Sequence, residues 1–161
     1  MQDFVHLHVH TQYSLLDGQA SVARLVDKAM QNGMKGIAVT DHGNMFGIKE
    51  FTNYVNKKNS GPKGEVKDLK KRIAGIEAGT IECEDKEAEI AACKAKIVEA
   101  ENKLFKPIIG CEMYVARRTM DLKEGKPDQS GYHLIVLAKN ETGYHNLITV
   151  SYTHLTLPTI R

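Results

Sequence analysis

Histidine and acidic residues recur in this sequence at positions where they could bind metal ions. Near the N-terminus, His6, His8 and His10 alternate with apolar residues over 4–11. Such alternation is typical of a β-strand, which would place the three imidazoles on one face and Val5, Leu7 and Val9 on the other. Residues two apart on a strand lie ~7 Å apart, so neighbouring imidazoles could bind one ion or two adjacent ions. The simpler alternative is a half-exposed strand that contains histidine by chance.

Further candidates stand mostly where a predicted strand ends. Asp41 and His42 follow a continuously apolar run at 36–40, which suits a strand buried on both faces of a parallel sheet. Glu112 lies in another apolar stretch, where a buried carboxylate is costly unless it is paired or bound to a cation. An exposed edge position is the alternative explanation for Glu112. The complete candidate set is His8, His10, Asp17, Asp41, His42, Glu112 and His133.

The residue types in this set indicate a particular kind of metal site. Neutral imidazole and carboxylate are ligands of Zn²⁺, Mn²⁺ or Fe²⁺, and a set without thiolates argues against a structural zinc site. Mixed sites with a bridging acid commonly hold more than one ion, activate water and bind a phosphoryl group for in-line attack. The pattern therefore predicts metal-dependent phosphoester chemistry.

Alternating strand and helix signals must position these residues. Ser21 is a suitable N-cap for a helix at 22–31, and a second helix is expected at about 45–57. Further strands are expected at 107–115 and 132–138. The repeated order of strand, loop and helix predicts right-handed βα units of an α/β fold. In such folds the functional residues gather at the carboxyl ends of the strands.

Residues 60–106 differ in composition from the rest of the chain. Helix formers dominate, and ten basic residues balance ten acidic ones. A narrow apolar stripe with a break at Gly79 and Thr80 predicts a surface helical hairpin inserted in a loop. A partner-binding coiled coil is the alternative, but the apolar seam is too irregular for sustained heptads.

Composition limits the class of protein further. A chain of 161 residues fits one domain or a piece of a larger protein, and 42% hydrophobic with 26% charged residues is typical of a globular fold. The net charge of +2 is too small to argue for nucleic-acid binding. Three cysteines at irregular spacings fit a reducing cytosol. The sequence shows no signal-peptide pattern and no membrane-spanning run, so we expect a cytoplasmic protein that does not associate with membranes.

Residues 150–161 do not continue the α/β pattern. They are rich in threonine and similar to a translated transposon-end adapter of the kind used in sequencing libraries. We therefore expect the natural sequence to stop near Thr149, and we assign no function to the tail.

Taken together, the motifs resemble the PHP (polymerase and histidinol phosphatase) family. The flanking stretches 44–47 and 137–144 are most similar to the N-terminal domains of bacterial replicative DNA polymerases. The resemblance covers 1–58 and 107–149 and leaves the helical insertion outside, so the domain is assigned to 1–149. The motifs that carry it are residues 4–11, 13–18, 39–43, 110–112 and 132–134.

The resemblance implies a distorted (β/α)7 TIM-like barrel with up to three divalent metal ions at the carboxyl ends of its strands. Asp41 is expected to orient an imidazole and His6 to lie outside the ligands, while Glu112 is the bridging carboxylate. Catalytic roles are implied for Glu112, His10 and Asp41. The implied metal ligands are His8, His10, Asp17, His42, Glu112 and His133. The later ligands of the family, including an Asp-x-His pair, would lie beyond residue 149, so we expect an incomplete barrel with weak metal affinity.

Three functions are consistent with the resemblance. The first is the N-terminal PHP domain of a DNA-directed DNA polymerase, acting as a metal-dependent phosphoesterase or 3′–5′ exonuclease. Its implied partners are DNA and deoxynucleotides, through downstream domains, and other replicase subunits such as a proofreading subunit and the sliding clamp. The second is a free-standing phosphatase of the histidinol-phosphatase kind, and the third is a metal-poor scaffold that docks a proofreading subunit. The fragment alone is expected to be inactive.

Overall fold

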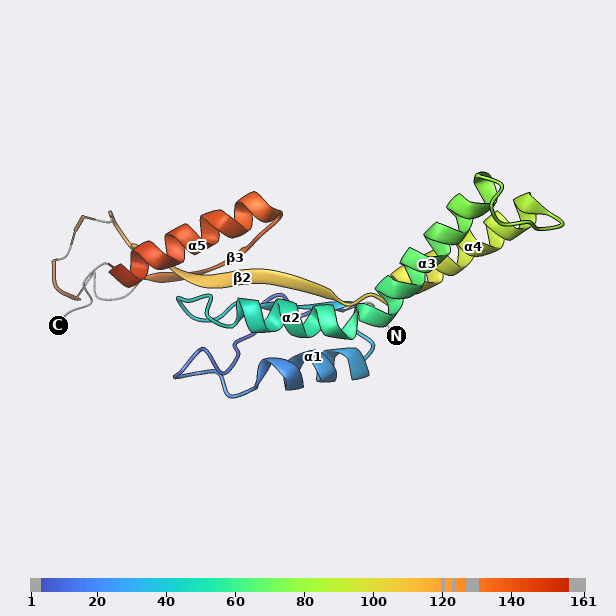
Figure 1. The fold of residues 1–161 in the computed structure, drawn as a ribbon. Helices are drawn as coiled ribbons and strands as arrows, with labels where there is room; N and C mark the ends of the chain where they lie inside the picture. Colours follow the sequence, from blue (N-terminus) through green and yellow to red (C-terminus); the bar gives the residue numbers. More distant parts are fainter. Residues whose placement is uncertain (1–3, 120, 123, 127–130, 157–161) are drawn as a thin grey trace. The chain divides into compact units, whose positions relative to one another are not determined.

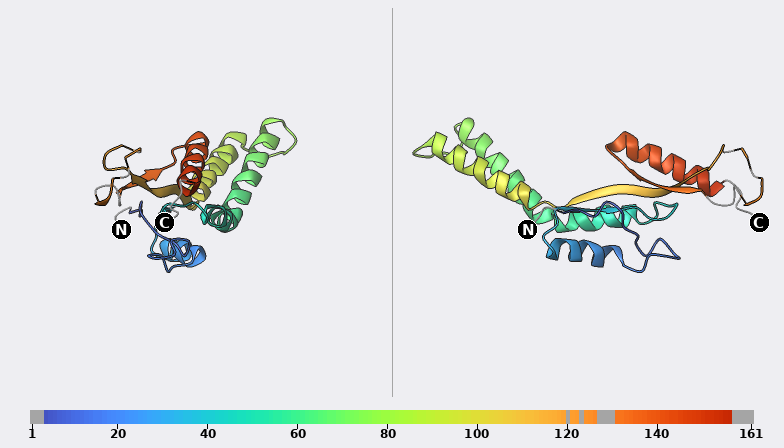
Figure 2. Two further views of the ribbon diagram at one scale, coloured as in Figure 1. Left: turned by 90° about the vertical axis from the view of Figure 1, so that its left-hand side faces the viewer. Right: turned by 180° about the vertical axis from the view of Figure 1, so that it is seen from behind.

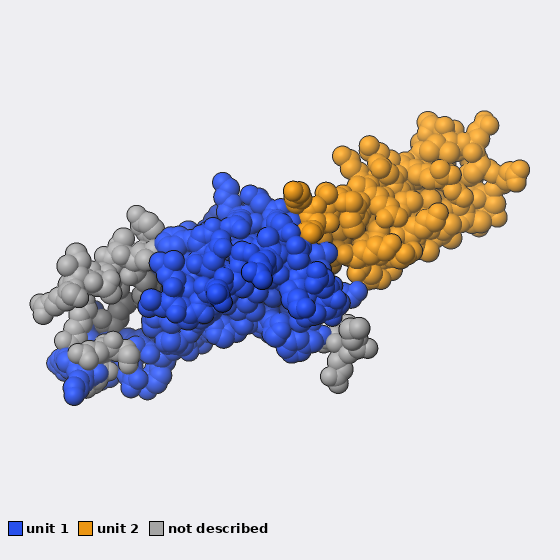
Figure 3. All heavy atoms as spheres, turned by 90° about the horizontal axis from the view of Figure 1, so that it is seen from below, with its two compact units in different colours: residues 1–54, 107–161 blue, residues 55–106 orange. Residues whose placement is uncertain are grey.

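The computed structural model describes residues 4–119, 121–122, 124–126 and 131–156, and it has the mixed α/β composition that the sequence predicts (Figure 1). Clustering of contacts divides the chain into two units, one within 1–54 and 107–161 and the other at 55–106 (Figure 3). Within the described residues no helix is both long enough and apolar enough to cross a membrane. In chain order the elements are α1 (Val22–Gln31), β1 (Gly36–Val39), α2 (Ile48–Lys58), α3 (Ser60–Glu77), α4 (Lys86–Asn102), β2 (Lys106–Val115), β3 (Tyr132–Leu137) and α5 (Glu141–Thr156).

Helix α1 begins and ends at the residues that the sequence predicts. The Ser21 hydroxyl accepts a hydrogen bond from the backbone N–H of Arg24 and so caps the first turn. Val22, Val26 and Ala29 are buried along one face of the helix. This helical spacing of apolar residues is the reason that α1 packs with one face inward.

The N-terminal histidine segment is not the regular strand that the sequence predicts. Residues 4–10 lie beside β1, where the N–H of Ala38 donates to the carbonyl of His6 and the N–H of Thr40 donates to that of Val9. Between these two hydrogen bonds the N-terminal segment advances by three residues, while the chain beside it advances by only two. The segment bends at Leu7. An extra residue of this kind interrupts the alternation of side chains, and Leu7 is 51% exposed rather than part of an apolar face.

The three strands form one sheet in the order β1-β2-β3. All four residues of β1 are buried, as expected for a strand in the middle of a fold. Just past its end, His42 pairs with Glu112 of β2 in a parallel bridge. The sheet continues parallel at this point, so the carboxyl end of β1 lies beside the C-terminal half of β2.

Strand β3 departs from the predicted parallel arrangement, because it runs antiparallel to β2. A loop can join antiparallel neighbours, whereas parallel neighbours need a longer crossover that is usually helical. The described residues between β2 and β3 contain no α-helix. The described strands therefore form an open mixed sheet, not a closed barrel.

The register of β2 and β3 separates their side chains into two faces. Glu112 lies opposite Ile135, and Tyr114 lies opposite His133, so these four side chains share one face. The other face carries Cys111 and Met113, which pack with Leu147 of α5 in a buried cluster. Figure 2 shows α5 alongside this strand pair from two further directions. Helix α5 extends past residue 149, near which we expect the natural sequence to end.

The second unit consists largely of α3 and α4, which occupy the segment where a helical hairpin is expected. Gly79, with a φ of 72°, follows α3 and allows the left-handed turn that starts the connection. The Asp85 side chain caps α4 by accepting from the N–H of Ala88. At the base of the hairpin, the Asn59 amide group bonds both the carbonyl and the N–H of Phe105.

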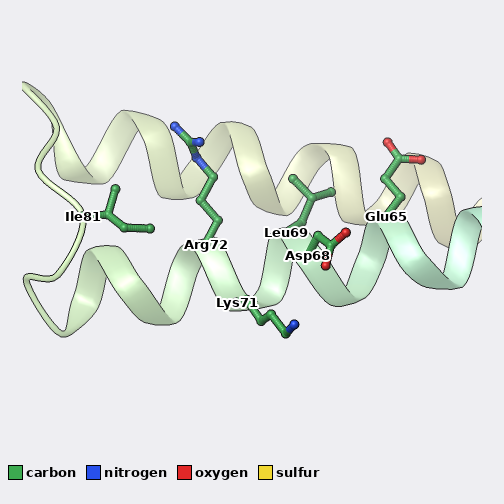
Figure 4. A pocket seen from close by; sticks show the side chains of 6 residues that line it. All are labelled: Glu65, Asp68, Leu69, Lys71, Arg72 and Ile81. Atoms are coloured by element: carbon green, nitrogen blue, oxygen red, sulfur yellow. The ribbon is translucent and has the colours of Figure 1, made fainter.

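A pocket of about 550 Å³ lies on the surface of this hairpin (Figure 4). Its charged side chains include both signs, and Arg72 is paired with Glu89 at 2.7 Å. The pocket contains no histidine and so does not resemble a site for the predicted chemistry. Its lining residues are Glu65, Asp68, Leu69, Lys71, Arg72 and Ile81.

Candidate metal centre

Four imidazoles and two carboxylates converge in the first unit. The contributing segments are residues 8–17, the end of β1, and the face of β2 and β3 that carries Glu112. The ligand atoms form three groups, in each of which they lie within 4.8 Å of one another. The groups are His8, His10 and Glu112; His10, Asp17 and His42; and His42, Glu112 and His133. Every metal ligand implied by the sequence resemblance is therefore in this cluster.

Glu112 lies at the centre of the cluster, and its two oxygens face different histidines. Oε2 lies 2.5 Å from Nε2 of His10 and 3.6 Å from Nε2 of His8. Oε1 lies 2.5 Å from Nδ1 of His133. Only 4% of the residue is exposed. The paired and buried position excludes the exposed-edge explanation for this acid.

Asp17 connects the two histidine motifs from the loop that follows the N-terminal segment. Its Oδ1 lies 3.1 Å from Nδ1 of His10, and its Oδ2 lies 3.2 Å from Nδ1 of His42. The loop is closed by Gly18, whose N–H donates to the carbonyl of Ser14. A Cβ atom at Gly18 would lie 1.9 Å from the carbonyl oxygen of Thr11, so only glycine fits here.

The surrounding imidazoles also set the charge state of the two acids. Burial raises the pKa of Glu112, but the hydrogen bond with His10 and the electrostatic influence of His42, His10 and His8 together lower it below its usual value. For Asp17, burial likewise raises the pKa, while hydrogen bonds and charge from His42 and His10 lower it overall. Both acids are therefore held as carboxylates, the form that binds cations.

Asp41 lies outside the three groups, and its hydrogen bonds are to the backbone and hydroxyl groups of Thr11 and Ser14. Its side chain is fully buried, and Oδ1 accepts from the backbone N–H of Thr11 at 2.6 Å and from the Ser14 hydroxyl at 3.2 Å. Oδ2 accepts from the Thr11 hydroxyl at 2.9 Å. The Ser14 hydroxyl in turn accepts from the backbone N–H of His42 at 2.9 Å. The carboxylate thus holds the backbone beside His10 and His42, whereas the resemblance implies that it orients an imidazole ring.

Several hydroxyl-bearing residues of the site were missed by sequence reasoning. Thr11 and Ser14 anchor Asp41, and Thr40 contacts His8 at 2.9 Å. Tyr114 contacts Nε2 of His42 through its hydroxyl, and its ring packs against His42 and His133. Tyr114 stands two residues after Glu112, and side chains two residues apart on a strand lie on the same face. This spacing was the signal that could have identified Tyr114 as part of the site.

His6 lies outside the cluster, as the resemblance implies. Its ring packs edge-on against Phe4, with the ring centroids 4.7 Å apart. The bend at Leu7 separates these two rings from those of His8 and His10, which pack against each other at 4.8 Å.

The donor atoms fit a site for divalent metal ions. Each of the four imidazoles and two carboxylates offers a nitrogen or oxygen ligand atom to at least one of the three groups. Catalytic zinc sites usually have three protein ligands and leave the fourth position to water, which matches the three residues of each group. Nitrogen and oxygen donors without sulfur suit Zn²⁺, Mn²⁺ and Fe²⁺.

Comparison with known proteins gives matches along most of the chain. Residues 6–97 and 88–156 match the family model described as "PHP domain". The chain is 40% identical to the DNA polymerase III subunit alpha of Treponema pallidum over 149 residues, which are 92% of this chain and 9% of that protein. The corresponding protein of Borreliella burgdorferi is 38% identical over 151 residues, again 92% and 9%. That of Aquifex aeolicus is 31% identical over 156 residues, 93% and 10%. The chain spans about a tenth of the length of these relatives.

Proposed function

The chain belongs to the PHP domain family, and from this premise we propose that it is the N-terminal PHP domain of a replicative DNA polymerase alpha subunit. The similarity to three such subunits covers more than nine-tenths of the chain. Each of these relatives is a polymerase subunit rather than a free-standing phosphatase, which argues for the polymerase assignment. On this proposal the whole protein is a DNA-directed DNA polymerase, which uses DNA and deoxynucleotides through its downstream domains.

Within that protein, we assign the metal centre to phosphoester cleavage, with the 3′ end of DNA as the substrate. The observation that carries this proposal is the position of Glu112, whose two oxygens face His10 and His133 from opposite sides of one carboxylate. Bound divalent ions supply Lewis-acid stabilisation of a phosphoryl group and activation of water. The residues that would hold them are His8, His10, Asp17, His42, Glu112 and His133.

The protein's own residues prepare this site before any substrate arrives. His10 is held from both sides, through Nδ1 by Asp17 and through Nε2 by Glu112. We therefore keep Glu112 and His10 as catalytic candidates. Asp41 becomes a positioning residue, because its carboxylate reaches the site through Thr11 and Ser14. Preorganised groups of this kind avoid reorganisation at the moment of reaction.

We also propose that downstream residues complete a (β/α)7 barrel around this sheet. Strand β3 is an edge strand among the described residues, and an open edge favours pairing with a further strand. The domain assignment of 1–149, with the 60–106 insertion and a non-native tail at 150–161, remains part of the proposal. The family match and α5 both continue to residue 156, and sequencing the genomic locus will decide where the natural sequence ends.

Other replicase subunits, among them a proofreading subunit and the sliding clamp, are the expected partners of the whole protein. Replication of bacterial DNA also implies that the protein works in the cytoplasm. The relatives support these assignments only through their name, DNA polymerase III subunit alpha.

The test of the cleavage function uses the full gene product rather than the fragment. Release of 3′ nucleotides from a primer end is measured with Mn²⁺ or Zn²⁺ for the unmodified protein and for Glu112→Gln. Glu101→Gln, which changes an acid on the surface of α4, is the matched control. We expect Glu112→Gln to abolish release and Glu101→Gln to leave it unchanged. Metal binding without Glu112-dependent release would contradict cleavage, and neither metal binding nor release would favour the metal-poor scaffold.

A further inference from the structure

Thr40 follows β1, is fully buried, and has its hydroxyl group among three polar atoms of the N-terminal segment. The hydroxyl oxygen accepts from the backbone N–H of Val9 at 3.0 Å. The hydroxyl proton is donated to the carbonyl oxygen of Val9 at 3.3 Å. The third neighbour is Nδ1 of His8, at 2.9 Å.

The direction of this third contact depends on where the hydroxyl proton points. A threonine hydroxyl has one proton to donate and two lone pairs to accept with. With the proton on the Val9 carbonyl and one lone pair taken by the Val9 N–H, the second lone pair faces Nδ1 of His8. In this arrangement Nδ1 of His8 carries a proton and donates it to Thr40.

This assignment determines what the other nitrogen of His8 can do. A neutral imidazole with its proton on Nδ1 has a free lone pair on Nε2. Nε2 faces the metal cluster, 3.6 Å from Oε2 of Glu112. That separation is longer than a hydrogen bond, whereas Nδ1 lies within hydrogen-bond distance of Thr40.

We propose that Thr40 is a positioning residue that fixes His8 in the tautomer protonated on Nδ1 and so presents Nε2 as a metal ligand. The proposal rests on the proposed function only in taking a divalent metal ion as the ligand of the cluster. Hydrogen bonds from the outer nitrogen of a ligating histidine are known to set ring orientation and basicity, and losing them typically weakens metal binding ~10–100-fold.

The first test reads the tautomer directly in the chain freed of metal by a chelator. Long-range ¹H–¹⁵N correlation spectra at pH 8 distinguish imidazoles protonated on Nδ1 from those protonated on Nε2, and His8→Gln identifies the His8 signals. We expect His8 protonated on Nδ1. A His8 protonated on Nε2 would overturn the proposal without any variant of Thr40.

The second test removes the hydroxyl while keeping the side-chain shape. In Thr40→Val we expect the His8 tautomer preference to be lost and Zn²⁺ affinity in calorimetric titration to fall ~10–100-fold. Thr40→Ser keeps the hydroxyl and should retain both properties. Thr52→Val is the matched control, because the hydroxyl of half-buried Thr52 donates to the carbonyl groups of Ile48 and Lys49 within α2.

The outcomes separate positioning from mere stability. If Thr40→Val does not fold, as judged by circular dichroism, the wild-type tautomer and Thr40→Ser still decide the question. An unchanged tautomer or unchanged Zn²⁺ affinity in a folded Thr40→Val would overturn the proposal. If the His8 tautomer and the Zn²⁺ affinities are as expected but the protein cleaves no phosphoester, the proposed function is contradicted and the role of Thr40 stands.

Discussion

Glu112 and His133 meet at the same end of the sheet because β3 runs antiparallel to β2. Oε1 of Glu112 lies 2.5 Å from Nδ1 of His133. His133 is the second residue of its strand, while Glu112 stands near the end of β2. In a parallel pair the beginning of one strand lies far from the end of its neighbour, so the reversed direction of β3 is what brings this histidine to the site.

Removal of the His133 imidazole should weaken the metal group formed with His42 and Glu112. In His133→Ala we expect Zn²⁺ affinity to fall by a factor of ~10 or more, since a directly facing donor is lost. Calorimetric titration with elemental analysis measures affinity and the number of bound ions. His145→Ala is the control, because His145 lies exposed on α5 with Glu141 as its ion-pair partner at 3.9 Å. Equal binding by the two variants would contradict the role of His133.

Replacement of the Asp41 carboxylate should destabilise the fold as well as the site. Asn offers one accepting oxygen in place of two, while three donors from Thr11 and Ser14 converge on this side chain. We expect Asp41→Asn to lower the free energy of unfolding by about 2–4 kcal/mol. Urea denaturation measures the loss. Asp68→Asn, at an exposed position of α3, should change it by less than about 0.5 kcal/mol, and similar values for both would refute the buried-anchor interpretation.

A side chain at residue 18 should disrupt the loop that carries Asp17. The added Cβ of Gly18→Ala would lie 1.9 Å from the backbone oxygen of Thr11, which cannot move independently of the loop. We expect a loss of about 1–3 kcal/mol in unfolding free energy, together with weaker Zn²⁺ binding. Gly61→Ala, where a Cβ meets no atom within 4 Å in α3, should be neutral or stabilising. Unchanged Zn²⁺ affinity in Gly18→Ala would show that the position of Asp17 does not depend on this contact.

Local signals in the sequence were sufficient for some parts of this structure. The bounds of α1 follow from Ser21 and the spacing of Val22, Val26 and Ala29, which are properties of neighbouring residues. Several members of the candidate cluster could be predicted because their side-chain types are unusual in or beside apolar strands. For His42, which follows β1, convergence required only that strand ends share one edge of the sheet, whereas His133 reaches that edge from the start of antiparallel β3.

Other parts depend on contacts that local patterns do not encode. The offset between His6 to Val9 and Ala38 to Thr40 arises only when the two segments pair. The direction of β3 is visible only in its pairing with β2. The apolar pattern of the strand itself does not encode that direction. The hydroxyls of Thr40 and Tyr114 are common in strands, so their role emerges only from the atoms that they contact.

The buried thiol of Cys111 provides a prediction of cysteine reactivity in the chain freed of metal. Burial, and secondly the negative charge of Asp41, raises its pKa to about 11 from an ordinary value of 9.0. At pH 8 we expect Cys111 in the folded chain to react with iodoacetamide far more slowly than half-buried Cys83. Mass spectrometry of the alkylated peptides measures both rates, and denatured chain should show no such difference. Equal rates in the folded chain would contradict the buried position of Cys111.

The same shift predicts how stability changes at alkaline pH. Between pH 9 and 11 the thiol is deprotonated in the unfolded chain but still protonated in the folded chain. The unfolded state then binds fewer protons, so the free energy of unfolding falls as the pH rises, by at most ~1.4 kcal/mol per pH unit for one group. Lysines and tyrosines titrate in this range too, so the comparison is with Cys111→Ala, in which their contribution persists. Urea denaturation from pH 8 to 11 should show a steeper loss of stability for the unmodified chain than for the variant, and parallel curves would refute the raised pKa.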